Sequence, residues 1–408
     1  MRTVINFLLS LLIIFISSCS SGQNKTGQNI PGIKPADKGK VISGVVCLKD
    51  PSVSYALYLP SGYSQERKSP LILAFDPHGS GNLPLEQYKR LAEGYGYIMI
   101  GSENSKNGQQ INETQAIINS LMEEIVLRYS VDTSRIYVMG FSGGARVASL
   151  VALYRGGIKG MIGCGAGFAG SDQPARFRFD YIGMAGNADF NMNELTGLDG
   201  QLEQANFRHV LIIFDGKHEW PPAETMEQAF IWNEFCAMKD GQIQKNPGMI
   251  GDFKNKMQYQ LQKDDQNPGT VKKYADLLLM IRFLDGLTRV DTEKETLAKI
   301  ATSEEFKKEE IKNSLARNKE LQEQQMFSEN FYLKDLNWWK KRITDYDLRI
   351  TNGKDDDDVL MCKRIKGYLS LLAYMKYSSA IASGEHEKAD FSLQVYRIVD
   401  PENAAKIK

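Results

Sequence analysis

The sequence predicts an α/β domain with a mainly parallel sheet, followed by an all-α region. Two observations predict this order. Over residues 41–240, short apolar runs alternate with amphipathic stretches of helix length, which is typical of a parallel sheet with helices on both faces. Beyond Tyr259, the apolar periodicity is helical throughout. A chain of 408 residues is long enough for two domains, and we place them at residues 41–240 and 241–408.

The predicted strands differ in their pattern. Residues 55–59 alternate at the strand period and stop at Pro60, as expected of a half-buried strand. Later strands are continuous apolar runs, which is typical of parallel strands buried on both faces. We expect them at residues 70–75, 97–101, 136–139, 160–164, 181–185 and 209–214. Helical periodicity predicts helices at residues 113–129, 145–154 and 225–238, between or after these strands.

The C-terminal region is predicted to consist of helices at residues 274–287, 304–325, 336–350, 359–383 and 387–399. The last pair resembles a tetratricopeptide repeat. Gly384, Ala389 and Pro401 occupy the repeat's small, small and proline positions, although Tyr377 stands where the repeat prefers a small residue. We therefore expect a TPR-like helical domain with a possible protein partner.

Charge and motif content exclude several functions. Lys plus Arg and Asp plus Glu number 50 each, so no net field attracts nucleic acid. The sequence has no dinucleotide fingerprint, Walker motif or metal-ligand spacing, and we expect neither a metal nor an organic cofactor. We expect the four scattered cysteines after Cys19 to be buried free thiols: Cys47, Cys164, Cys236 and Cys362.

The N-terminus has the features of an export signal. Arg2 precedes an apolar run over residues 4–16, which is too short for a typical transmembrane helix. The run ends in Ile16-Ser17-Ser18-Cys19, which resembles the lipobox of bacterial lipoproteins. This resemblance implies a signal peptide at residues 1–18, a lipid on Cys19 and a tether over residues 19–40. Ser20 rather than Asp follows the cysteine, so we expect a bacterial envelope protein, with the outer membrane preferred.

Residues 140–144, Gly-Phe-Ser-Gly-Gly, fit the pattern G-x-S-x-G. The motif follows a predicted strand and opens a predicted helix, which is the arrangement of a nucleophile elbow. Ser142 is therefore the candidate nucleophile. The amide of Gly143 would lie at a helix N-terminus, where it would bind the oxygen that becomes negative during acyl transfer.

Residues 132–145 resemble the elbow region of α/β-hydrolases of the polyhydroxyalkanoate depolymerase and feruloyl esterase kind. The resemblance extends over about residues 55–238, roughly half of the chain. It implies a Ser-His-Asp triad, an acyl-enzyme, and carboxylic esters as substrates, including acyl or feruloyl esters of polysaccharide. Because fold does not determine substrate, the ester class is an analogy.

A serine hydroxyl needs a base, and the sequence has only four histidines: His78, His209, His218 and His386. His218 follows the last predicted strand of the α/β domain in Gly216-Lys217-His218-Glu219-Trp220-Pro221. This string resembles the catalytic-histidine segment of the same families, so His218 is the predicted base. We expect His78 to brace its glycine-containing loop.

The third residue should leave the sheet between the serine and the histidine. Residues 186–189, Gly-Asn-Ala-Asp, follow the strand at 181–185 and resemble the turn of the catalytic acid. Asp189 is therefore the predicted acid, with Glu194 and Asp199 as competitors downstream. The loop at residues 76–81, Asp-Pro-His-Gly-Ser-Gly, would complete the oxyanion hole through the amide of Ser80.

The sequence therefore predicts a lipid-anchored serine hydrolase that cleaves carboxylic esters. Two alternatives remain open at this point. One is a serine peptidase that uses the same triad. The other is an inactive hydrolase module whose helical domain binds other envelope proteins.

Overall fold

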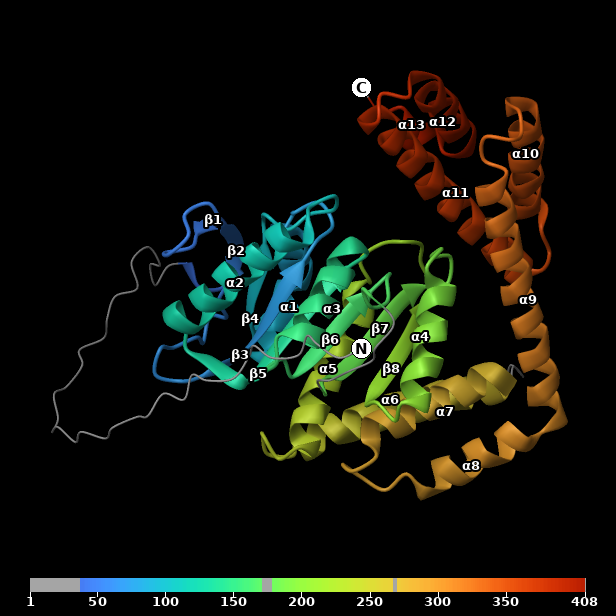
Figure 1. The fold of residues 1–408 in the computed structure, drawn as a ribbon. Coiled ribbons are helices and arrows are strands. Elements are labelled where there is room, and N and C mark those ends of the chain that lie inside the picture. Colours follow the sequence, from blue (N-terminus) through green and yellow to red (C-terminus); the bar gives the residue numbers. More distant parts are fainter. Residues whose placement is uncertain (1–36, 171–177, 267–269, 408) are drawn as a thin grey trace, which may run out of the picture. The chain divides into compact units, whose positions relative to one another are not determined.

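The computed structural model describes residues 37–170, 178–266 and 270–407 (Figure 1). Its single named sheet has the order β1-β2-β4-β3-β5-β6-β7-β8 within these ranges. Strand β2 pairs antiparallel with β1 and β4, and all later pairings are parallel. The strands are β1 (Val41–Val46), β2 (Ser54–Tyr58), β3 (Ser69–Phe75), β4 (Ile98–Ser102), β5 (Val131–Phe141), β6 (Gly160–Cys164), β7 (Asp180–Gly186) and β8 (His209–Phe214).

Over residues 37–170 and 178–239, the helices are α1 (Asn82–Tyr95), α2 (Ile111–Arg128), α3 (Gly143–Tyr154), α4 (Met192–Gln204) and α5 (Ala223–Lys239). Ile72 and Ala74 of β3 share one apolar core with Tyr88 of α1 and Phe230 of α5. Side chains alternate along a strand, so Leu71 and Leu73 point to the opposite face. The sheet is therefore covered on both sides at this strand, which explains why β3 is a nearly continuous apolar run.

The apolar core that contains Ile72 and Phe230 also includes residues that follow the predicted domain boundary at residue 240. Helices α6 (Pro247–Gln266) and α7 (Thr270–Leu284) contribute buried aromatic residues to it. Phe253 and Phe283 stack with their ring centroids 4.5 Å apart, and Phe283 also meets the ring of Trp232 from α5. The sequence predicts residues 246–248 to be a polar connection, which is wrong, because α6 begins at Pro247. Proline is tolerated at the first helical position, where its missing N–H costs little.

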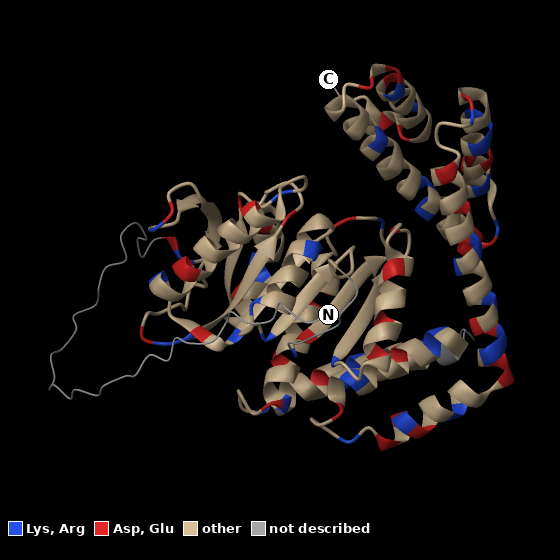
Figure 2. Cartoon of the chain, viewed as in Figure 1, with Lys and Arg blue, Asp and Glu red and all other residues tan. Residues whose placement is uncertain are grey.

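The remaining helices are α8 (Asp291–Thr302), α9 (Glu304–Glu329), α10 (Leu336–Asn352), α11 (Asp356–Ala382), α12 (His386–Val399) and α13 (Pro401–Ala404). Those from α9 onward build a second core around Phe327, Trp339, Ile365 and Val395. Figure 2 shows basic and acidic residues interspersed along them. The predicted all-α C-terminal region is confirmed.

The TPR-like character of this region remains a prediction. Gly384 lies between α11 and α12 with φ 71°, and Pro401 opens α13. Ala389 is buried in α12. The three positions that suggested the repeat therefore lie at a helix–helix turn, in a packed helix and at a helix start.

The predicted signal peptide and Cys19 lie outside the described residues, as does most of the predicted tether. Among the helices that are described, none has the length and apolar character needed to cross a membrane.

Candidate active site

Ser142 lies on a sharp turn between β5 and α3. Its backbone has φ 52° and ψ −121°, a conformation that costs a non-glycine residue free energy. The glycines on either side allow this turn to pack. A Cβ on Gly140 would approach the Gly144 carbonyl oxygen to 2.1 Å, and one on Gly144 would approach the Phe75 carbonyl oxygen to 2.1 Å. The sequence therefore folds here into a strained elbow that raises the serine hydroxyl above the end of the sheet.

Three predicted residues meet at the carboxyl ends of the parallel strands. His218 Nε2 lies 2.9 Å from Ser142 Oγ, and His218 Nδ1 lies 2.9 Å from Asp189 Oδ1. Ser142 follows β5, Asp189 follows β7 and His218 follows β8. The carboxyl ends of parallel strands lie at one edge of a sheet. His218 therefore bonds to Ser142, 76 positions away in the sequence, and to Asp189, 29 positions away.

The Asp189 carboxyl group is buried, with 1% of the residue exposed. Its Oδ1 also accepts a hydrogen bond of 2.8 Å from the Asn191 amide. This second donor fixes the carboxylate, which in turn orients the imidazole through Nδ1–H.

The two competing carboxylates have other partners. Glu194 accepts bonds from the Arg146 guanidinium, at 2.8 and 2.9 Å, and from the Gly167 amide. Asp199 lies 3.0 Å from Arg282 and 3.1 Å from His209 Nε2. Burial raises the pKa of Asp199, but its bonds to His209 and Arg282 outweigh this and lower the pKa below its usual value. Both groups are structural ion-pair partners in this arrangement.

The other histidines of the described residues have surroundings that do not include a hydrogen bond to Ser142. His78 is on the surface of its loop, with its side chain 82% exposed and its Nδ1 3.5 Å from Asp76 Oδ1. His209 is buried at the start of β8 against Asp199, and His386 opens α12 in the C-terminal region.

Two phenylalanines hold the ring of His218. The ring centroid lies 4.6 Å from that of Phe141 and 4.2 Å from that of Phe190. Its side chain is 20% exposed, so solvent or a substrate reaches one edge of the imidazole. The sequence analysis missed both residues. Their positions in the sequence could have indicated them, because Phe141 directly precedes Ser142 and Phe190 directly follows Asp189.

The loop after β3 is tied to the histidine loop. The buried Asp76 accepts the His78 amide at 2.9 Å and the Trp220 indole N–H at 3.0 Å. Trp220 lies two residues after His218. Asp76 therefore couples the loop that carries Ser80 to the loop that carries His218.

The predicted oxyanion donors both lie next to a helix N-terminus. Gly143 is the first residue of α3, and Ser80 precedes α1. Over residues 37–170, 178–266 and 270–407, neither amide donates a hydrogen bond to a protein group. The Asn107 side chain, which sequence reasoning missed, packs against Gly143: a Cβ there would lie 1.8 Å from Asn107 Oδ1. No local pattern indicates this contact.

The strand order, the antiparallel β2 and the serine elbow after β5 define an α/β-hydrolase fold. This confirms the predicted fold class of the sheet domain. The carboxyl edge of its sheet carries a hydroxyl, an imidazole and a carboxylate in series, which is the arrangement that nucleophilic catalysis requires.

No protein-family model and no curated protein sequence matches the chain. Among solved structures, an S-formylglutathione hydrolase from Staphylococcus aureus is similar at 14% identity and a TM-score of 0.39. It covers 47% of this chain and 95% of its own.

Two esterases give comparable values. An esterase from Pyrobaculum calidifontis shares 14% identity at a TM-score of 0.38, covering 49% of this chain and 85% of its own. A feruloyl esterase module from Clostridium thermocellum shares 12% identity at a TM-score of 0.37, with coverage of 44% and 82%. Likeness at this level does not extend to substrate or activity.

Proposed function

We propose that this protein is a serine hydrolase that cleaves carboxylic esters through an acyl-enzyme. The observation that carries the proposal is the hydrogen-bond series Ser142 Oγ, His218 Nε2, His218 Nδ1 and Asp189 Oδ1, with both contacts at 2.9 Å. The strained elbow beneath Ser142 supports it, because a costly backbone conformation persists where its surroundings maintain it.

In the first half of the reaction, Ser142 Oγ attacks the ester carbonyl carbon while His218 Nε2 takes the hydroxyl proton. The carbonyl oxygen becomes negative and is held by the amides of Gly143 and Ser80. Collapse of this intermediate breaks the bond to the alcohol, which leaves with the proton from His218. The enzyme then carries an acyl group on Ser142.

In the second half, His218 takes a proton from water, and the resulting hydroxide attacks the acyl carbon. The carbon–Oγ bond breaks, the acid leaves and the proton returns to Ser142. Asp189 accepts Nδ1–H in both halves and stabilises the imidazolium.

Turnover of p-nitrophenyl acetate and butyrate, with Ser142→Ala as the matched variant, tests this function. We expect release of nitrophenol by the wild-type protein and its loss in Ser142→Ala. Peptide p-nitroanilides in parallel address the peptidase alternative, and greater turnover of these would favour it. A folded wild-type protein that cleaves neither substrate would support the inactive-module alternative.

Acyl or feruloyl esters of polysaccharide are the proposed natural substrate class, on the resemblance of residues 132–145 to feruloyl esterases. Release of ferulate from methyl ferulate and from feruloylated oligosaccharide tests this narrower proposal. Turnover of small aryl acetates without any ferulate release would restrict the proposal to simple esters.

We also propose that a lipid on Cys19 anchors the protein to the bacterial envelope, preferentially to the outer membrane. The support is the sequence Ile16-Ser17-Ser18-Cys19 after an apolar run. Expression in a bacterial host with labelled palmitate should give a labelled membrane protein, and Cys19→Ala should abolish the label. Equal labelling of both proteins would disprove the anchor.

A further inference from the structure

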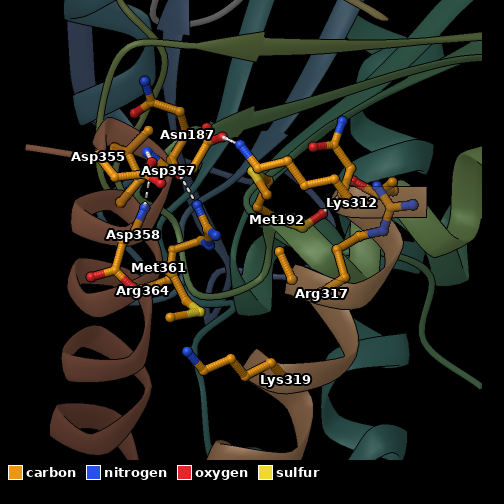
Figure 3. Close-up of a pocket in the computed structure, with 14 residues that line it drawn as sticks. Asn187, Met192, Lys312, Arg317, Lys319, Asp355, Asp357, Asp358, Met361 and Arg364 are labelled. Atoms are coloured by element: carbon orange, nitrogen blue, oxygen red, sulfur yellow. Dashed lines mark hydrogen bonds and ion pairs between the residues drawn. The ribbon is translucent and has the colours of Figure 1, made fainter. Parts of the chain in front are cut away.

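Helix α11 contacts the turn that carries Asp189. Arg364 Nη1 of this helix donates a hydrogen bond of 2.7 Å to the carbonyl oxygen of Asn187, two residues before Asp189. Asn187 and Arg364 line a cavity of about 360 Å³ together with other residues of α4, α9 and α11, and Figure 3 shows the side chains of both. A side chain of the C-terminal region thus binds the backbone of the proposed active site.

A buried carboxylate holds Arg364 in place. Glu320 of α9 is 0% exposed, and its carboxylate accepts Arg364 Nε at 3.0 and 3.1 Å and Nη2 at 2.8 Å. The Arg364 side chain is itself only 10% exposed. The planar guanidinium therefore binds Glu320 along one edge and the Asn187 carbonyl through Nη1, in a fixed geometry.

Burying such a pair has a desolvation cost that apolar residues of similar size would avoid. A contribution to stability therefore does not by itself explain why Arg364 and Glu320 occupy these buried positions. The contact of Arg364 with Asn187 supplies a more specific role, because it orients a backbone group next to the proposed triad.

Asn187 connects the two loops that carry Asp189 and His218. Its amide donates to the Phe214 carbonyl at 2.8 Å, and its side chain Oδ1 accepts the Gly216 amide at 3.3 Å. Phe214 ends β8, and Gly216 lies two residues before His218. A displacement of Asn187 therefore changes the spacing between the carboxylate and the imidazole.

A second contact from α11 reaches Phe190, whose ring packs on the imidazole of His218. Gly367 lies three residues after Arg364, so both residues share one side of the helix. A Cβ on Gly367 would lie 3.2 Å from the Phe190 ring, and this ring packs on His218 with centroids 4.2 Å apart. Helix α11 therefore supports the acid turn through Arg364 and the histidine through Phe190.

We propose that Arg364, held by Glu320, is a positioning residue for the triad. The helical C-terminal region then contributes to catalysis, because it fixes the spacing between the turn that carries Asp189 and the loop that carries His218. This inference rests on the proposed ester hydrolysis. Catalysis needs these groups within a fraction of an ångström, so loss of the support should lower kcat and leave KM nearly unchanged.

The first test compares two double variants of the full chain. Arg364→Met/Glu320→Met removes the pair without leaving a buried charge alone. Arg349→Met/Asp358→Met removes a different arginine–carboxylate pair, one that joins α10 and α11 through a 3.0 Å contact. With p-nitrophenyl acetate, we expect the first variant to lose about 10–100-fold in kcat with little change in KM, and the second to resemble wild type.

The second test substitutes two helical glycines. Gly367→Leu should push Phe190 toward His218 and lower kcat, whereas Gly251→Leu in α6, where a Cβ would meet nothing within 4 Å, should not. The low-field proton resonance of the His218–Asp189 hydrogen bond gives a readout that does not depend on turnover. We expect it to shift or broaden in Arg364→Met/Glu320→Met.

The outcomes separate the two proposals. Suppose that the wild-type protein turns over ester and Ser142→Ala abolishes this. If the folded Arg364→Met/Glu320→Met variant then has wild-type kcat and an unchanged resonance, only the positioning role is overturned. A wild-type protein without ester turnover overturns the proposed function, and the positioning role with it. A rise in KM at constant kcat would also contradict positioning, because it would indicate a lost substrate contact.

Discussion

Replacement of Asp189 by asparagine removes one charge and leaves the shape of the side chain nearly unchanged. The carboxylate is buried, accepts His218 Nδ1–H at 2.9 Å and accepts the Asn191 amide at 2.8 Å. An asparagine keeps one oxygen but brings an NH₂ group, which favours the imidazole tautomer with its proton on Nε2. That tautomer donates to Ser142 and no longer accepts the serine proton.

The expected loss follows from the same substitution in a serine protease triad, where kcat falls about 10⁴-fold. At about 1.36 kcal/mol for each factor of ten, this corresponds to roughly 5.4 kcal/mol of transition-state stabilisation. We expect a loss of this size in kcat for p-nitrophenyl acetate, with KM close to that of the wild-type protein. Circular dichroism should show an unchanged fold.

Two matched carboxylate variants complete this experiment. Glu194→Gln and Asp199→Asn change acids on α4 that pair with Arg146 and Arg282. Both should retain near wild-type kcat. If Asp189→Asn keeps more than about a tenth of the activity, or Glu194→Gln loses as much, the assignment of Asp189 is wrong.

Three further predictions concern coupling, packing and thiol chemistry. Asp76→Ala leaves the buried Trp220 indole N–H without its acceptor and should lower the free energy of unfolding by about 1–3 kcal/mol in urea titrations; an unchanged value would argue against the coupling of the two loops. Trp339→Ala empties the centre of the helical core and should cost about 3–5 kcal/mol in guanidinium titrations, whereas a cost near zero would contradict that packing. Burial raises the pKa of the Cys47 thiol to about 12 and that of Cys362 to about 11, so neither should react with iodoacetamide in the native protein at pH 8. Mass spectrometry should show alkylation of both only after denaturation, and rapid native labelling would contradict this burial.

The sheet was largely predictable because its central strands are buried on both faces. Strand β3, over Ser69–Phe75, is buried at every position, and its residues 70–75 form an unbroken apolar run in the sequence. Strand β1 escaped prediction because it is half-exposed at the sheet edge, with a register shift between Ile42 and Val45. Helix α4 was missed for a related reason: only Leu195 and Leu202 are buried in it, so it has no clear apolar stripe.

The site was predictable to the extent that its chemistry depends on local sequence. Glycines around Ser142 indicate the turn on which it lies, and the position of His218 after a strand places its imidazole at the same edge of the sheet. The contact between Arg364 and Asn187 joins residues 177 positions apart. It depends on how α9, α11 and the acid turn pack together, and no periodicity or motif indicates it. Asn107 at Gly143 is a similar case.

Labelling with a fluorophosphonate probe, followed by mass spectrometry of the peptides, tests most directly whether Ser142 is an activated nucleophile. We predict one adduct, on Ser142, whose formation slows strongly in His218→Ala and is absent in Ser142→Ala. An adduct on another residue, or a folded wild-type protein that does not react, would contradict the proposed mechanism.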